Sequence, residues 1–401
     1  MRILQINQTY KLGSTGKIMS DLNDVINQND CEGYMLCAYS LEKRENLYVM
    51  DNRSFPLNSK LNILKMRVTG INGYSKKKET IKALEWVDRI KPDIIHLHNI
   101  HGDWINLKLL FYYIKEKKIA VVWTLHDCWA FTGRCSHFEL CGCYKWKTEC
   151  NNCPNRKVYP KTYFFDFSKR MYIDKKDMFT GMDNVYIVTP SKWLKQYVIS
   201  SYLGEYPVCV INNGIDTSVF KNSKNTSKYL KNEGKIIVLG VASSWSDTKG
   251  FSDFIKLDEM LDHNKFQIVM VGLNEKQLCS IPNTIIGIER TNNVEELVEL
   301  YSNADVFVNL TYQDNYPTTN LEAVSCGIPV ITYRTGGSPE SISNTNGYIV
   351  KQGDLKQVAE LIRNVSWSEI DPAELHERVA DIFSKEKCFK KYLDLYANID
   401  Q

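Results

Sequence analysis

The sequence predicts an α/β protein built from two doubly wound, parallel-sheet domains. At 401 residues the chain is too long for one ordinary hydrophobic core and fits two domains of roughly 150 to 200 residues each. Short apolar, β-branched runs alternate with helical patterns throughout, an arrangement typical of parallel sheets covered by helices on both faces. A turn-rich break near the middle of the chain separates two such sets.

The predicted strands fall into two groups, and each strand is a short run rich in Val, Ile and other apolar residues. In the first half of the chain they cover residues 2–7, 34–40, 94–99, 120–127, 185–191 and 208–213. In the second half they cover residues 235–241, 266–273, 284–289, 304–310, 329–334 and 347–350.

The predicted domain boundary lies at the turn-rich segment 213–217, which is followed by a polar stretch over 221–235. It divides the chain into an N-terminal domain, 1–212, and a C-terminal domain, 213–382. Apolar residues at helical spacing after Ser384 predict a terminal helix over 383–401. Such a helix needs a partner surface, and we expect it to pack back on the N-terminal domain.

Composition indicates a globular protein, with 43% hydrophobic residues, 24% charged residues and a formal net charge of +3. No apolar run approaches the roughly 20 residues of a membrane-spanning helix, and Met1 leads directly into a predicted strand. We expect a cytoplasmic protein with no nucleic-acid partner. The basic segment 60–78 has two interpretations: peripheral contact with the inner face of a membrane, or, as the favoured alternative, a solvated surface helix.

The segment 314–340 is the most informative for function. Asp314 lies in a predicted loop, and Glu322 follows on the first turns of a predicted helix. Between them, Thr318 and Thr319 offer hydroxyl groups and backbone N–H groups at the positive end of that helix, where a pyrophosphate binds favourably. This order of groups suits a nucleotide diphosphate sugar, with one acid addressing the sugar and the other the ribose.

This segment resembles the acidic-x7-acidic signature of the retaining glycosyltransferases of family 4, with Asp314 in place of the usual first Glu. The resemblance implies the GT-B fold, in which two Rossmann-like domains face an interdomain cleft. It also implies that Asp314 contacts the donor sugar and that Glu322 holds the ribose. The other donor-binding residues that it implies are Asn315, Thr318, Thr319 and, as a candidate for reading the base, Thr291.

A cation at the exit of the strand 235–241 adds to this site. Lys249 can meet a diphosphate as a point charge and stabilise the leaving group as its bond to the sugar breaks. In the family an Arg and a Lys bracket the donor phosphates, and Ser244 stands where this Arg is expected. We therefore expect Lys249 to act without half of the usual clamp. The alternative for Lys249 is a plain helix-entry turn.

Glycines follow the first predicted strand, at the start of a predicted helix. Gly13 and Gly16, with Lys17 beside them, let the backbone approach a ligand closely. Their spacing does not fit a Walker A loop, and a tight strand-to-helix turn is the alternative. In the family this loop closes over the phosphate or the transferred sugar.

Four of the seven histidines sit at two neighbouring strand exits: His96, His98, His101 and His126. The resemblance makes His126 the histidine that contacts the donor sugar, with Asp127 and one of His98, Asn99 or His101 toward the acceptor. His96 and His98 alternate with apolar residues on a strand, so we expect one of them to be a hydrogen-bonded interior residue.

A group of cysteines predicts a structural zinc site. Cys150 and Cys153 form a C-x2-C pair, and Cys135 with Cys141 supplies a second pair, which together suffice for tetrahedral zinc; Cys143 is a rival ligand. Because a cytoplasmic protein has little need for disulfides, the alternative is a set of reduced, unliganded thiols. We expect no catalytic metal, since a helix dipole and a cation stabilise the leaving group instead.

Together these features predict a retaining hexosyltransferase that moves a sugar from a UDP- or GDP-sugar to a hydroxyl of a growing, lipid-linked glycan. The segment 124–154 resembles a subgroup of family 4 that builds bacterial surface and capsular polysaccharides. Two alternatives stay open: a GT-B epimerase of sugar nucleotides, and a catalytically degenerate glycan-binding protein. A nicotinamide oxidoreductase is not favoured, because no G-x-G-x-x-G follows the first strand of either domain.

Overall fold

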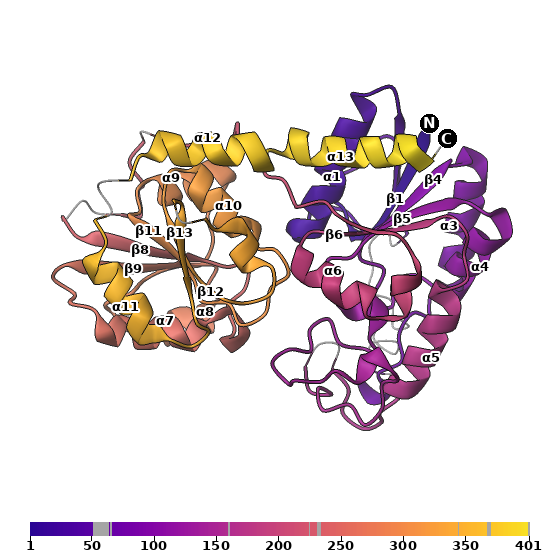
Figure 1. Cartoon of the computed structure of the whole chain (residues 1–401), viewed down its shortest axis with the longest axis horizontal. Coiled ribbons are helices and arrows are strands. Elements are labelled where there is room, and N and C mark those ends of the chain that lie inside the picture. The colour runs from indigo at the N-terminus through magenta and orange to yellow at the C-terminus, as the bar shows by residue number, and fades with distance from the viewer. Residues whose placement is uncertain are drawn as a thin grey trace. The chain divides into compact units, whose positions relative to one another are not determined.

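The computed structural model describes residues 1–50, 64, 66–158, 161–223, 225–230, 234–343, 345–366 and 370–399. The chain divides into two compact units: Met1–Ile211 with Phe389–Gln401, and Asn212–Cys388. Each unit contains one parallel sheet with helices on both faces (Figure 1). The predicted α/β class and its two doubly wound sheets are therefore confirmed.

The first unit contains a seven-stranded sheet in the order β3-β2-β1-β4-β5-β6-β7. Its strands are β1 (Arg2–Thr9), β2 (Glu32–Tyr39), β3 (Leu47–Val49), β4 (Ile94–Leu97), β5 (Ala120–Thr124), β6 (Val185–Thr189) and β7 (Val208–Val210). The chain runs outward from β1 to β3 and then returns to the other side of β1. The strand order thus reverses between β1 and β4.

Helices cover both faces of this sheet. They are α1 (Gly13–Asn27), α3 (Lys77–Ile90), α4 (Leu107–Lys117), α5 (Ser168–Phe179), α6 (Lys192–Ile199) and α13 (Lys385–Ile399). Leu36 joins the large core that includes residues of α3 to α6, whereas Met35 and Cys37 pack with Met19 of α1. Alternate side chains of β2 thus point toward opposite faces of the sheet. On α13, Tyr396 is buried and contacts His96 of β4.

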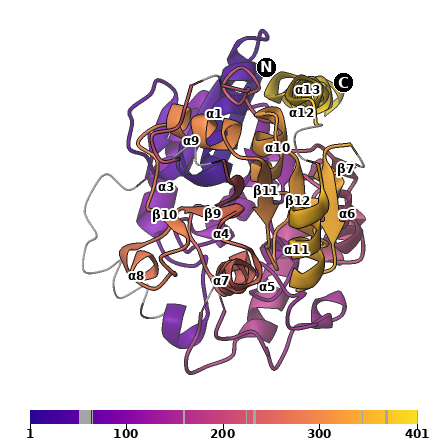
Figure 2. The same cartoon turned by 90° about the vertical axis from the view of Figure 1, so that its left-hand side faces the viewer.

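The second unit contains a six-stranded sheet in the order β10-β9-β8-β11-β12-β13. Its strands are β8 (Ile236–Val241), β9 (Phe266–Val271), β10 (Ile286–Ile288), β11 (Val306–Asn309), β12 (Val330–Tyr333) and β13 (Gly347–Val350). Its helices are α7 (Phe251–Met260), α8 (Glu275–Leu278), α9 (Val294–Ser302), α10 (Thr318–Ser325), α11 (Leu355–Asn364) and α12 (Pro372–Phe383). The strand order reverses between β8 and β11. In Figure 2 this sheet lies between α9 and α10 on one face and α7 and α11 on the other.

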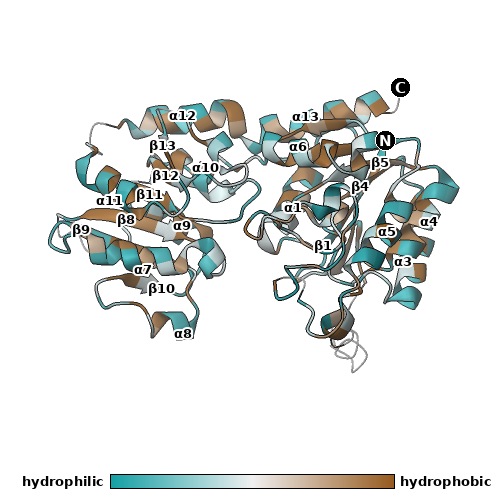
Figure 3. Cartoon of the chain, turned by 60° about the horizontal axis from the view of Figure 1, so that its bottom comes forward, coloured by the Kyte–Doolittle hydropathy of each residue, from teal (hydrophilic) through white to brown (hydrophobic). Residues whose placement is uncertain are grey.

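Two cores sandwich this second sheet. Leu239 packs with residues of α9, α10 and α12, whereas Val238 packs with residues of α7 and α11. The strands are largely hydrophobic and the helices carry hydrophilic residues as well (Figure 3). Each fully buried Leu or Val contributes about 1.5 to 3 kcal/mol relative to an exposed one, so the two cores hold the strand ends in place.

Every predicted strand segment contains an observed strand. The strand that the sequence analysis missed, β3, has only three residues and lies at the edge of its sheet. In the basic segment 60–78, Lys60 and Lys65 lie outside the described residues. Across the part of the chain that the structure describes, no helix is both long and apolar enough to cross a membrane.

Candidate functional site

The loops that follow β8 and β11 meet where the strand order of the second unit reverses. In open α/β sheets, ligands bind beyond the carboxyl ends of the strands at such a point. The first loop carries Lys249 and the second carries Asp314. Thr248 links them, because its carbonyl oxygen accepts hydrogen bonds from Tyr312 N (2.8 Å) and Thr311 Oγ1 (3.3 Å).

Lys249 and Asp314 form an ion pair, with 2.5 Å between Nζ and Oδ2, although 65 positions separate them in the sequence. Their side chains are 38% and 21% exposed, respectively. Two glycines with positive φ hold the backbone of these loops in place. A Cβ on Gly250 would lie 2.4 Å from Leu310 O, and one on Gly336 would lie 1.7 Å from Asp314 O.

Helix α10 begins just after Asp314 and presents the remaining predicted donor-binding residues. Its N-cap is Pro317, which forms no side-chain capping bond, and its first two residues, Thr318 and Thr319, are partly buried. On the same helix, Glu322 Oε2 accepts a hydrogen bond from Tyr301 OH (3.3 Å). The structure thus collects Asp314, the two threonines and Glu322 on one loop and helix beside Lys249.

Buried amides fix the orientation of α10. Asn320 donates to Ser338 Oγ (2.9 Å) and Ser341 Oγ (3.1 Å), and it accepts from Asn309 Nδ2 of β11 (2.8 Å). The predicted donor-binding residue Asn315 is also buried, and its carbonyl oxygen accepts from Gly337 N (2.9 Å). These bonds tie the start of α10 to the loops that surround it.

Two predicted donor-binding residues lie farther out. Ser244 is exposed in the loop after β8. Thr291 is partly exposed and follows β10, the edge strand, two strand positions from β8. Ser244 thus lies on the same loop as Lys249, five residues before it, whereas Thr291 follows a strand at the edge of the sheet.

In the first unit, α1 starts at the reversal between β1 and β4. Gly13 is its first residue and Leu12 forms no side-chain cap. Gly16 is buried, and its carbonyl oxygen accepts from Lys11 N (3.0 Å), whereas Lys17 is exposed.

His96 on β4, His98 just after it and His126 in the loop after β5 form one group, in which His96 and His98 are buried and His126 is partly buried. His98 Nδ1 lies 3.1 Å from His126 Nε2, and the ring of His98 stacks on that of His96 at 4.1 Å. His96 contacts Tyr396 OH (2.6 Å) and Thr124 Oγ1 (2.8 Å), so His96 is a hydrogen-bonded interior residue. Burial lowers the pKa of His96 to about 3 and that of His126 to about 4, and it holds the pKa of His98 well below its usual value.

Asp127, next to His126 in the sequence, pairs with the fourth histidine of this region, His101. Its Oδ2 pairs with His101 Nε2 (3.2 Å) and its Oδ1 accepts from Trp129 N (2.8 Å). Burial raises the pKa of Asp127, but His101 and the hydrogen bonds outweigh this effect and leave the pKa below its ordinary value. Asp127 is therefore ionised at neutral pH.

The cysteine group differs from the predicted ligand set. Cys135, Cys143, Cys150 and Cys153 line one small cavity. Cys141 is exposed instead, and its thiol donates to Phe138 O (3.1 Å). Within the described ranges, no three His, Cys, Asp or Glu side chains are arranged as a metal site. Cys141, a predicted ligand, is therefore not among the residues that line this cavity, whereas its rival Cys143 is.

Two buried cations beside these cysteines escaped the sequence analysis. Arg134 is buried, and its Nη1 and Nη2 find no hydrogen-bond partner among the described residues. Lys175 is also buried; its ammonium donates to Trp129 O (2.5 Å) and lies 4.0 Å from the centre of the Trp129 ring. Burial lowers the pKa of Lys175 to about 7.

Residues 72–219 match the protein family described as "Glycosyltransferase Family 4", and residues 221–381 match the family described as "Glycosyl transferases group 1". The two together span most of the chain. The two parallel sheets, the candidate site and the family matches together identify the protein as a GT-B glycosyltransferase that uses a nucleotide sugar. The chain belongs to family 4, as its acidic signature predicted.

Its relatives include proteins named for the biosynthesis of colanic acid and of capsular polysaccharide. A protein of Escherichia coli strain K12, assigned to colanic acid biosynthesis as glycosyl transferase WcaC, is 23% identical over all of both chains. The capsular polysaccharide biosynthesis glycosyltransferase CapM of Staphylococcus aureus is 26% identical over 56% of this chain and 63% of its own. A Campylobacter jejuni N-acetylgalactosaminyltransferase, named for a diphospho-undecaprenol acceptor, is 28% identical over 40% and 45%.

Solved structures share the fold. The sucrose-phosphate synthase of Thermosynechococcus elongatus matches with a TM-score of 0.73 at 14% identity, over 100% of this chain and 99% of its own. Anabaena HepE, solved in complex with UDP-glucose, matches with a TM-score of 0.67 at 14% identity, over 99% and 100%. The predicted GT-B fold is confirmed.

Replacing Gly336 should loosen the segment that carries Asp314. Gly336→Ala adds a Cβ that meets the Asp314 carbonyl oxygen in a left-handed conformation, so we expect the free energy of unfolding of the second unit to fall by about 3 kcal/mol or more. Gly234→Ala is the matched control, because Gly234 has a similar φ but no atom near the added Cβ, and it should cost about 1 kcal/mol. Equal losses in urea titrations of the two variants would refute the role of this contact.

The buried histidines should make the first unit sensitive to acid. An unfolded histidine has a pKa of about 6.5, above the folded values of His96 and His126, so the unfolded chain binds more protons below that pH. The free energy of unfolding should fall as the pH drops from 6.5 toward 4, by up to about 1.4 kcal/mol per pH unit for each histidine. His126→Asn should reduce this slope in denaturant titrations. An unchanged slope for His126→Asn contradicts this account.

Proposed function

We propose that this enzyme transfers a sugar from a UDP- or GDP-sugar to a hydroxyl of a growing, lipid-linked glycan, with retention of the anomeric configuration. The observation that carries the proposal is the Lys249–Asp314 pair beside the start of α10. The polysaccharide enzymes among its relatives, and the diphospho-undecaprenol in the name of one of them, support such an acceptor. HepE, which binds UDP-glucose, supports such a donor.

The start of α10 is suited to hold the pyrophosphate of the donor. Six α-helices elsewhere in the described part of the chain begin with a side chain that accepts a backbone N–H: Asn106, Ser191, Asn274, Asn293, Asp354 and Asp371. Helix α10 begins with Pro317, which offers no such acceptor. The first N–H groups of a helix lack intrahelical partners and attract anions, so this end supplies donors for phosphate oxygens. Thr318 and Thr319 add hydroxyl groups there.

Lys249 and Asp314 exchange partners when the donor binds. Ion pairs that are partly exposed are worth only about 0 to 1 kcal/mol, so a pyrophosphate can draw Lys249 away from its carboxylate. Asp314 then accepts hydrogen bonds from hydroxyls of the sugar, and Glu322 does the same for the ribose. Lys249 stabilises the diphosphate as its bond to the anomeric carbon breaks, and no divalent ion takes part.

The N-terminal domain, 1–212 with the terminal helix 383–401, supplies the acceptor side. Its Gly13 to Lys17 loop approaches the donor phosphate, and His126 contacts the donor sugar, with His98 and Asp127 on the acceptor side. The domain 213–382 holds the nucleotide, with Ser244 near the phosphates and Thr291 near the base. We place the reaction in the cytoplasm, at the inner face of the membrane that carries the acceptor lipid.

Two substitutions separate binding from catalysis. Glu322→Ala should weaken the binding of UDP or GDP about tenfold in calorimetry, because it removes the ribose contact. Lys249→Ala should lower the turnover of donor sugar about 100-fold with a smaller effect on affinity, because the charge on the leaving group develops in the transition state. Arg334→Ala, which removes an exposed cation of the second unit, is the control. Unchanged turnover in Lys249→Ala, or release of epimerised nucleotide sugar without an acceptor product, would overturn the proposal.

We also propose a structural zinc ion on Cys135, Cys143, Cys150 and Cys153, with Cys143 replacing the predicted Cys141. These four thiols line one cavity, and Gly133 N donates to Cys150 Sγ (3.1 Å). Four thiolates on Zn²⁺ carry a net negative charge, and the buried cations that interact with these cysteines offset it. The thiols must turn toward a common centre to bind the ion, since they do not form a metal site as they stand.

Elemental analysis of protein purified without chelators should find about one zinc per chain. Cys135→Ser and Cys143→Ser should lose the metal and lower the melting temperature, because the long loop is then unpinned. Cys141→Ser is the matched control and should retain it, since Cys141 lies outside the cavity lining. Metal-free wild-type protein, or loss of zinc in Cys141→Ser alone, contradicts this ligand set.

A further inference from the structure

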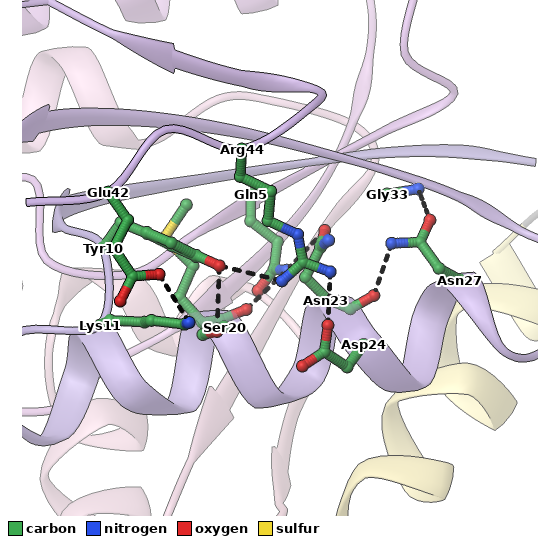
Figure 4. Close-up of polar contacts among 11 residues, drawn as sticks. Gln5, Tyr10, Lys11, Ser20, Asn23, Asp24, Asn27, Gly33, Glu42 and Arg44 are labelled. Carbon is green, nitrogen blue, oxygen red and sulfur yellow. Dashed lines mark hydrogen bonds and ion pairs between the residues drawn. The ribbon is translucent and has the colours of Figure 1, made fainter. Parts of the chain in front are cut away.

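A buried line of hydrogen bonds leads from helix α1 to His126. Gln5 lies on β1, and its Nε2 donates to Met19 O of α1 (3.1 Å). The same nitrogen also lies 3.4 Å from Asn23 Oδ1 (Figure 4). Its Oε1 lies 3.1 Å from His98 Nε2, and His98 Nδ1 lies 3.1 Å from His126 Nε2. Gln5 is fully buried and His98 nearly so.

The direction of every bond in this line follows from its first member. A backbone carbonyl can only accept, so the Gln5 group that faces Met19 O is the amide nitrogen and the group that faces His98 is the carbonyl oxygen. His98 must then carry its hydrogen on Nε2. Because burial keeps His98 neutral, its Nδ1 is an acceptor, and the nitrogen of His126 that faces it must be the donor.

We propose that Gln5 and His98 are positioning residues that hold His126 in the Nε2–H tautomer, so that His126 Nδ1 can only accept a hydrogen bond. This inference rests on the proposed function only in naming the partner, a hydroxyl of the donor sugar. A neutral ring of this tautomer can accept from a hydroxyl, and it has no proton to deliver from Nδ1. His126 therefore orients the sugar and does not act as a general acid toward the leaving diphosphate.

The opposite side of the histidine group supports the same arrangement. His96, stacked on His98, is held by Tyr396 OH and Thr124 Oγ1, and Thr124 Oγ1 in turn contacts Tyr392 OH (3.0 Å). The histidine rings are thus fixed by polar contacts from β1, β5 and α13. A ring with fixed partners on both nitrogens cannot flip without leaving a buried group unpaired.

Nitrogen NMR of protein labelled with ¹⁵N-histidine reads the tautomer directly and needs no substrate. We expect the wild type to show His126 protonated at Nε2 and unprotonated at Nδ1 at pH 7, with the signal assigned through His126→Asn. Gln5→Leu removes the acceptor for His98 and should give a mixture of both tautomers. Gln267→Leu, in β9, is the control for losing a glutamine elsewhere and should preserve the wild-type pattern.

Kinetics then tests the consequence for the reaction. Gln5→Leu should lower the turnover of donor sugar about tenfold and Gln267→Leu much less, because a mispaired His126 ring presents the wrong nitrogen to the hydroxyl. A wild-type His126 protonated at Nδ1, or a tautomer that Gln5→Leu leaves unchanged, would overturn the inference whatever the activity. Should the wild type turn over no nucleotide sugar, the proposed function fails, and the NMR result still decides the tautomer.

Discussion

The reversal of strand order in each sheet is the constraint on which the site depends. The connections that follow the two neighbouring strands at that point cross to opposite sides of the sheet. This leaves a crevice beyond the carboxyl ends of the strands, where a ligand can bind. In the second unit the reversal between β8 and β11 brings Lys249 to Asp314, and in the first the pairing of β1 with β4 brings Gln5 to His98. Packing on both faces of each sheet fixes the strand ends, and thereby the loops.

The two units supply different chemistry because they expose their polar groups differently. In the second unit Lys249 and Asp314 remain partly exposed, so their charges are available to a ligand at little cost. In the first unit burial removes the charge from His96, His98 and His126 at neutral pH, and these rings can act only through hydrogen bonds. One unit thus offers charge to a diphosphate, and the other offers neutral, oriented rings to hydroxyl groups.

Much of this arrangement was predictable from the sequence, because parallel strands buried on both faces are continuous apolar runs. The edge strand β3 was not, since Leu47 to Val49 is too short to form such a run. The Lys249–Asp314 contact was also out of reach, because it needs β8 and β11 to be neighbours. A lone glutamine within the apolar run of β1 was the available signal for Gln5, but its meaning depends on the pairing of β1 with β4.

Cysteine spacing shows the same limit. The spacing of the cysteines along the sequence does not distinguish Cys141 from Cys143 as a candidate ligand. Only the path of the turn after Phe138 decides which of the two lines the cavity. The buried Arg134 and Lys175 were invisible for a related reason, since burial of a charged side chain depends on the packing of a long irregular loop.

The most direct test of the central claim is a crystal structure of the enzyme with UDP or GDP bound. The account predicts that the pyrophosphate lies at the first N–H groups of α10, within hydrogen-bonding distance of Lys249 Nζ, and that Asp314 has released the lysine. A pyrophosphate bound away from α10, with the Lys249–Asp314 pair intact, would contradict it.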